Sequence, residues 1–148
     1  MRTHRIPPTL SLCMIVKNEA LYLARCLDSV QDMVDEIIIV DTGSTDNTVE
    51  IAQRYQATIV SHHWQHNFSL ARNTSLAHAT GDWILVLDAD ETLERMTSER
   101  LWQLISQTSA DGIQCIVRSF MPPQSLLAYE DGVVTRLFRN HASYPRTR

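Results

Sequence analysis

The stretch "ILVLDADETL" (residues 84–93) decides the fold, because a strongly apolar run ends there in a group of acidic residues. Four apolar residues lead directly into Asp88, Asp90 and Glu91. A buried strand gains nothing from carboxylates at its end, since unpaired buried charge costs free energy. The stretch therefore indicates a functional site. The carboxylates could hold a divalent metal on a nucleotide diphosphate, or they could be the nucleophile and acid of a phosphatase.

The rest of the chain alternates short apolar runs with segments of helical periodicity. Strands are expected at 9–16, 36–40, 57–61 and 83–87, with helices at 20–30, 47–55 and 69–79 between them. This order predicts right-handed βαβ units on a mainly parallel sheet flanked by helices. After Thr92 the pattern predicts a helix around Leu101, Leu104 and Ile105, strands at 112–118 and 133–138, a loop at 121–125 and a frayed end at 139–148.

Local signals fix further details of two helices. Asn47 and Glu50 have the spacing of a helix N-cap pair. In the helix at 69–79, the residues expected to face the core are Leu70, Thr74 and Ala77, and Gly81 is placed to end that helix.

Polar residues follow three of the four expected strands. They are Asn18, Asp41, Asp88 and Asp90. Ligands of parallel sheets bind outside the carboxyl ends of the strands. We therefore expect these side chains to converge on one rim of the sheet.

The Asp88-Ala89-Asp90 triplet suits a metal better than a phosphatase. Alternate carboxylates separated by a small residue can present oxygen ligands to Mg²⁺ or Mn²⁺. Such an ion can support a departing diphosphate. A phosphatase also needs a downstream lysine, and the only lysine, Lys17, lies well upstream.

Other candidate groups give weaker signals on their own. In "DTGSTDNT" (41–48), Asp41 could accept a hydrogen bond from a base or ribose. Arg72 and Asn73 stand near a helix start, where arginine suits phosphate. A zinc site is disfavoured for the three histidines of "HHWQH" (62–66), because no Cys or acidic ligand accompanies them. The three cysteines, Cys13, Cys26 and Cys115, are expected to be buried thiols.

Composition limits the class of protein. The chain has 148 residues, enough for one domain with a core, and a net charge of -4, which argues against nucleic-acid binding. Its apolar runs are too short for a membrane span, and its start lacks the apolar core of a signal peptide. We therefore expect a cytoplasmic protein, at most peripheral at the inner face of a membrane through its partners.

With these residues in hand, the chain resembles a family 2 glycosyltransferase of the GT-A fold. The matching segments are "LSLCMIVKNEA", "VDEIIIVDTGSTDNTVEIA", "SLARNTSLAHATGDWILVLDADETL" and, more loosely, "RLFRN". Their order and spacing match as well. The resemblance implies a Rossmann-like nucleotide-diphospho-sugar transferase fold, with a nucleotide-sugar domain over 9–139 between terminal tails at 1–8 and 140–148.

The resemblance also implies a donor, a metal and site residues. The donor would be a nucleotide sugar, first of all a UDP-sugar, bound with Mg²⁺ or Mn²⁺. The implied donor-site residues are Val16, Asn18, Glu19, Asp41, Thr42, Arg72, Asn73, Asp88 and Ala89, with Asp90 as metal ligand, joined by Asp88. Asp88-Ala89-Asp90 is then the DXD motif. Family members of this type usually invert at the anomeric carbon by a single displacement, with a carboxylate as base.

The resemblance weakens after "RLFRN". The family continues there into an acceptor-binding half that carries the base, whereas "SYPRTR" (143–148) resembles nothing in that half. Glu130 and Asp131 are the last acidic residues, and neither matches a base motif. We therefore expect a donor-binding part with little activity of its own. A non-catalytic interaction domain remains an alternative. A nucleotidyltransferase is a weaker one, because "KNEALY" lacks the glycine-rich phosphate loop of that class.

Overall fold

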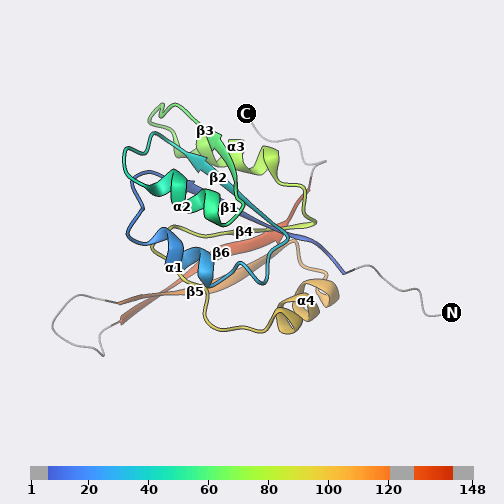
Figure 1. The fold of residues 1–148 in the computed structure, drawn as a ribbon. Helices are drawn as coiled ribbons and strands as arrows, with labels where there is room; N and C mark the ends of the chain where they lie inside the picture. Colours follow the sequence, from blue (N-terminus) through green and yellow to red (C-terminus); the bar gives the residue numbers. More distant parts are fainter. Residues whose placement is uncertain (1–6, 121–128, 142–148) are drawn as a thin grey trace.

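A computed structural model describes residues 7–120 and 129–141 (Figure 1). Its strands are β1 (Leu10–Val16), β2 (Glu36–Asp41), β3 (Thr58–Ser61), β4 (Trp83–Val86), β5 (Gly112–Phe120) and β6 (Tyr129–Arg139). Its helices are α1 (Leu23–Asp28), α2 (Thr48–Arg54), α3 (Phe68–His78) and α4 (Ser98–Gln107). None of the helices in these two ranges is long and apolar enough to cross a membrane.

The six strands form one sheet in the order β3-β2-β1-β4-β6-β5. β1 pairs in parallel with β2 and with β4, and β2 pairs in parallel with β3. β6 runs antiparallel to β4 and to β5, and Figure 1 shows β5 and β6 side by side as a long hairpin. The predicted parallel βαβ arrangement is confirmed for the first four strands, and the hairpin adds an antiparallel edge.

Helices cover both faces of the sheet. One face carries Leu12, Met14 and Leu85, and it packs against apolar residues of α1, α2 and α4, namely Leu23, Leu27, Ala52, Leu101 and Ile105. The opposite face carries Cys13, Ile38, Ile84 and Val86, and it packs against α3 through Leu76. β1, β2 and β4 are therefore buried on both sides, which explains their continuous apolar runs, whereas β3 lies at the edge and is only partly buried.

The end of the sheet opposite the predicted rim is fastened by one carboxylate. Oε1 of Glu36 accepts hydrogen bonds from the Ser11 hydroxyl (2.5 Å), the Thr80 amide (2.6 Å), the Thr80 hydroxyl (2.9 Å) and the Gly81 amide (3.2 Å). Gly81 approaches β1 so closely that an added Cβ would lie 2.5 Å from Ser11 Oγ and 2.9 Å from the Ser11 amide nitrogen. Its role is this close approach, because α3 already ends at His78.

The predicted inner face of α3 is wrong. Its buried residues are Ala71 and Ser75, whereas Leu70 is 41% exposed. The carbonyl of Ser75 accepts a 3.7 Å hydrogen bond from the Cys13 thiol of β1. Small residues on the inner face allow α3 to approach β1 this closely, and the larger Leu70 side chain points away.

The predicted N-cap position of α2 is confirmed, but its capping contact differs from the expected one. Asn47 stands at the N-cap position, but its side chain makes no capping hydrogen bond. Asp46 does this instead, because its carboxylate accepts from the Thr48 amide (3.0 Å) and the Thr48 hydroxyl.

Part of the expected frayed end is ordered. Arg139 closes β6, and the Asn140 side chain donates to the carbonyls of Ala79 (3.1 Å) and Gly81 (2.8 Å). The predicted loop at 121–125 and residues 142–148 lie outside the described residues. Cys13 and Cys26 are buried free thiols as predicted, and Cys115 is only half-buried.

Candidate functional site

The turn after β1 is locked to the turn after β2 through Asn18. Asn18 has a left-handed backbone conformation, with φ of 52°. Its side-chain oxygen accepts from the Thr45 amide (2.7 Å), and its own amide donates to the Ser44 hydroxyl (2.9 Å). The carbonyl of Val16 accepts from the Thr42 amide (3.0 Å) and hydroxyl (3.1 Å). The structure therefore brings these two predicted regions together.

Asp41 shapes the same turn from the end of β2. Its carboxylate accepts from the amides of Gly43 (3.2 Å) and Ser44 (3.1 Å), and the residue is only 8% exposed. Gly43 has a φ of 108°, a backbone conformation that suits glycine. Asp41 thus holds the backbone of the turn, and its exposure to a ligand is small.

The acidic segment after β4 is fixed on both sides. Within the loop, the Asp88 amide donates a hydrogen bond to Glu91 Oε2 (2.9 Å). Its carbonyl accepts from the Cys26 thiol of α1 (3.6 Å). Ala89 is buried between the two acids, whereas Asp88 and Asp90 are exposed. Burial of the small middle residue turns both aspartates towards the surface.

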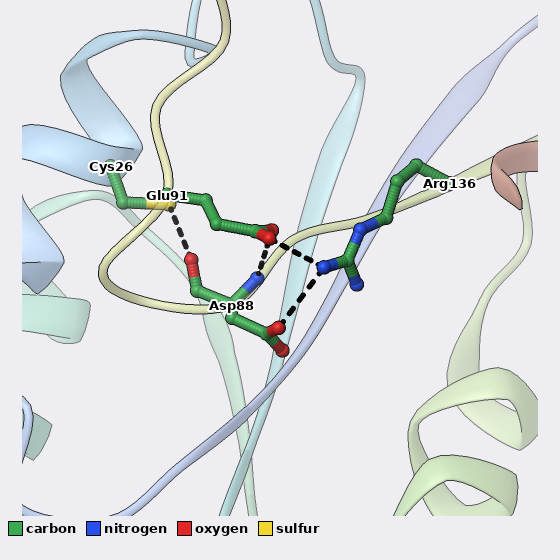
Figure 2. Close-up of polar contacts among 4 residues, drawn as sticks. All are labelled: Cys26, Asp88, Glu91 and Arg136. Carbon is green, nitrogen blue, oxygen red and sulfur yellow. Dashed lines mark hydrogen bonds and ion pairs between the residues drawn. The ribbon is translucent and has the colours of Figure 1, made fainter. Parts of the chain in front are cut away.

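Arg136 is a site residue that the sequence analysis did not single out. Figure 2 shows it reaching from β6 to the carboxylates of Asp88 and Glu91. Its Nη2 lies 3.1 Å from Asp88 Oδ2 and forms an ion pair with Glu91 Oε1. The side chain is 14% exposed. The "RLFRN" segment contained this arginine, but only the antiparallel return of β6 places it beside β4.

Glu19 adds a further acid to this rim. Its amide donates to the Thr48 hydroxyl (2.8 Å). Burial raises the pKa of the Glu19 carboxyl, and the nearby carboxylates of Asp90, Asp46 and Asp88 raise it further. The acids after β1, after β2 and after β4 therefore influence one another, as the predicted convergence requires.

Arg72 lies near this group, on α3. Burial lowers the pKa of the Arg72 guanidinium, the negative charge of Asp88 opposes that change, and the positive charge of Arg136 adds to it. Asn73 is exposed on the same helix. The histidine segment at 62–66 lies between β3 and α3. His62 is tied to the framework through its amide, which donates to the Asp41 carbonyl (2.9 Å), and through Nδ1, 3.3 Å from the Thr74 hydroxyl.

The rim can supply part of the ligand set of a divalent ion, and phosphate oxygens of a donor and water would supply the rest. Within 7–120 and 129–141, no group of three or more His, Cys, Asp or Glu side chains is arranged to hold a metal by itself. In the same ranges the Asp90 carboxylate has no hydrogen bond or ion pair, and only its backbone carbonyl is contacted, by Arg25 at 3.4 Å. Mg²⁺ is commonly held by one or two carboxylates together with substrate phosphates and water. Asp90, with exposed Asp88 beside it, matches that donor set.

A parallel sheet with polar turns gathered at its carboxyl ends, followed by an antiparallel hairpin, defines the class of GT-A nucleotide-diphospho-sugar transferases by fold. The family model described as glycosyl transferase family 2 matches residues 11–142. The chain therefore belongs to glycosyl transferase family 2.

Individual proteins show the same likeness. A TPR repeat-containing protein of Synechococcus elongatus is 59% identical over 83 residues, which are 56% of this chain and 21% of that protein. The SPbeta prophage-derived glycosyltransferase SunS of Bacillus subtilis is 32% identical over 134 residues, 89% of this chain and 31% of SunS. The structure of the glucosyl-3-phosphoglycerate synthase of Mycobacterium tuberculosis with Mn²⁺ and UDP-glucose superposes with a TM-score of 0.51 at 29% identity, over 57% of this chain and 34% of that one. The chain thus spans about a third or less of each of these proteins.

Proposed function

We propose that this chain binds a nucleotide-diphosphate sugar, with a UDP-sugar as first candidate, at the rim formed by the turns after β1, β2 and β4. The whole protein then transfers the sugar to an acceptor with inversion. The observation that carries the proposal is the exposed carboxylate of Asp90, which has no partner among residues 7–120 and 129–141. It lies next to Asp88 on a rim whose turns are braced by Asn18 and Asp41. The structure of a family relative with Mn²⁺ and UDP-glucose supports the donor and the metal.

Each predicted residue has a part in this proposal. Val16, Asn18 and Glu19 border the nucleotide, and Asp41 with Thr42 shapes the turn that faces the base and ribose. Arg72 and Asn73 lie on the α3 side of the donor. Asp88 and Ala89 line the ribose and diphosphate side, and Asp90 ligates the metal.

The chemistry divides between the metal and the chain. A bound Mg²⁺ or Mn²⁺ supplies positive charge for the departing diphosphate. The chain orients the donor through the braced turns and holds Asp90 towards it. The polar backbone groups of these turns are already bonded to Asn18, Asp41 and Asp46. The donor therefore meets a site that needs little reorganisation, which lowers the entropy cost of binding.

We propose that neither Glu130 nor Asp131, the last two acidic residues of the chain, is the general base. Asp131 forms an ion pair with Arg118 (2.8 Å) on the β5–β6 hairpin, and Glu130 precedes it on β6. On this proposal the 148-residue chain binds donor and transfers sugar slowly or not at all. Sugar transfer to an acceptor by the purified chain at a rate typical of an enzyme would overturn that part. The predicted cytoplasmic location is also part of the proposal.

A thermal-shift experiment tests donor binding. Ligand at ten times its Kd stabilises the folded state by about 1.4 kcal/mol, which raises the Tm of a domain of this size by about 3–6 °C. We expect UDP-glucose with Mn²⁺ to give such a shift, and Asp90→Ala to remove its metal-dependent part. The matched control is Asp32→Ala, which removes an exposed acid from the segment between α1 and β2. No shift at millimolar ligand would favour a non-catalytic interaction domain.

A further inference from the structure

Arg136 occupies an irregular position in the sheet. Along the β5–β6 pairing, Ile113 lies opposite Leu137, but Gln114 lies opposite Thr135. Arg136 is therefore the extra residue of a β-bulge, and no residue of β5 lies directly opposite it in the register. Bulges re-aim side chains and are common next to active sites. Here the bulge sets Arg136 beside the end of β4, since its neighbour Leu137 pairs with Leu85.

The Arg136 guanidinium is held at the rim although one of its buried donors is left without a hydrogen bond. The Arg136 side chain is 14% exposed, and its buried Nε has no hydrogen-bond partner among the described residues. A single nitrogen, Nη2, contacts both Asp88 and Glu91 (Figure 2). A purely structural arginine would be expected to use its fork of donors, because paired N–H bonds give the strongest contact with a carboxylate. Arg136 instead places one positive charge between two carboxylates.

That charge faces a strongly acidic group. The carboxylates of Asp90, Asp46 and Asp88 all act electrostatically on Glu19, and Glu91 adjoins Asp88. Without a cation, this rim would attract a divalent ion whether or not a nucleotide were present. A nearby positive charge opposes a metal ion and favours a diphosphate.

We infer that Arg136 is a positioning residue that serves as the counter-ion of the rim: it lowers the affinity of the rim for a free divalent ion and raises its affinity for the diphosphate of a nucleotide. The inference rests on the proposed function and deepens it. If Arg136 has this role, the site binds a metal–nucleotide complex in preference to the metal ion alone. The effects on the two ligands have opposite signs, and a merely structural role would weaken binding of both.

The experiment uses the 148-residue chain and its Arg136→Gln variant. Mn²⁺ binding without nucleotide is followed by the EPR signal of free Mn²⁺, and UDP binding without metal is followed by calorimetry. At low salt, removing one positive charge close to the ion should tighten Mn²⁺ binding about three- to tenfold and weaken UDP binding by a similar factor. The matched control is Arg118→Gln, on the same hairpin but paired with exposed Asp131. It should change neither affinity by more than about twofold, because both partners of the Arg118–Asp131 pair are solvent-exposed, where charges interact only weakly.

The outcomes separate this inference from the proposed function. If the unsubstituted chain binds no UDP even with Mn²⁺, both fail. If it binds UDP with Mn²⁺ but Arg136→Gln leaves Mn²⁺ affinity unchanged or weaker, only the inference fails. If Arg136→Gln does not fold, Arg136→Lys decides: because it keeps the charge, Mn²⁺ affinity should stay within about twofold of the original. A larger change in the lysine variant would overturn the counter-ion role.

Discussion

Replacing Glu36 by glutamine removes one negative charge from the junction of β1, β2 and the segment before β4, while the shape of the side chain is nearly kept. Four hydrogen bonds at this junction end on Glu36 Oε1, from Ser11, Thr80 and Gly81. The amide oxygen of glutamine can accept the same bonds. The substitution therefore isolates the contribution of the charge.

The expected loss is about 2 kcal/mol in the free energy of unfolding. Hydrogen bonds to charged groups contribute about 1.5–3 kcal/mol net against about 1 kcal/mol for neutral ones. Several bonds lose this increment, but they share one oxygen and the carboxylate is partly exposed, so the increments do not add in full. For a domain of this size, 2 kcal/mol corresponds to a fall in Tm of about 4–8 °C.

The loss should depend on pH. Burial acts to raise the pKa of the Glu36 carboxyl, but the hydrogen bonds from Ser11, Thr80 and Gly81 outweigh burial, and the pKa in the folded state is lowered. A lowered carboxyl pKa gives stability that is fully present above the unfolded pKa of about 4.3 and is lost as pH falls through the folded pKa. The deficit of Glu36→Gln should therefore be largest near neutral pH and should disappear in acid.

Urea unfolding of both proteins at several pH values between 7 and 3 measures this deficit. Glu94→Gln, in the exposed segment before α4, is the matched control and should be neutral within about 0.5 kcal/mol. An equal deficit for Glu36→Gln at neutral and acid pH would refute the reasoning, because the lost energy would then be packing and not charge.

Three more results are expected. Gly81→Ala should lower the free energy of unfolding by about 1–3 kcal/mol in urea, because the added methyl group meets the backbone of Ser11; a neutral effect would contradict the close approach. Asn140→Ala should cost about 1–2 kcal/mol in the same assay, since two carbonyls lose their donor; no loss would show that the end of β6 is frayed after all. Cys13 and Cys26 should resist alkylation at pH 8 in the folded protein, because burial raises the pKa of each thiol to about 12; rapid labelling followed by mass spectrometry would contradict their burial.

The residues of the rim were predictable from the sequence, because they follow directly from the ends of the apolar runs and from the parallel order of the strands. Apolar runs that end at Asn18, Asp41 and Asp88 belong to parallel neighbours, and parallel strands bring their carboxyl ends to one edge. Arg136 was not predictable in this way. It reaches the rim from an antiparallel strand and through a bulge, and neither the pairing nor the bulge leaves a local pattern in the sequence.

The errors in the helices have a different origin. Hydrophobicity predicted Leu70 on the inner face of α3, but close packing on β1 selected Ala71 and Ser75. Small side chains carry little hydrophobic signal even when they are buried. At α2 the N-cap position is Asn47 as predicted, but the side-chain contact with the first helical residue comes from Asp46, because either residue type can make it and the turn geometry decides between them.

The most direct test of the central claim, that Asp90 on this rim binds the metal of a nucleotide-sugar donor, is a calorimetric titration of the chain with UDP-glucose in the presence and absence of Mn²⁺. We expect binding that is tighter with Mn²⁺ in the unsubstituted chain, and equally weak binding with and without Mn²⁺ in Asp90→Ala. Binding in Asp90→Ala that Mn²⁺ still strengthens by the same factor would contradict the claim.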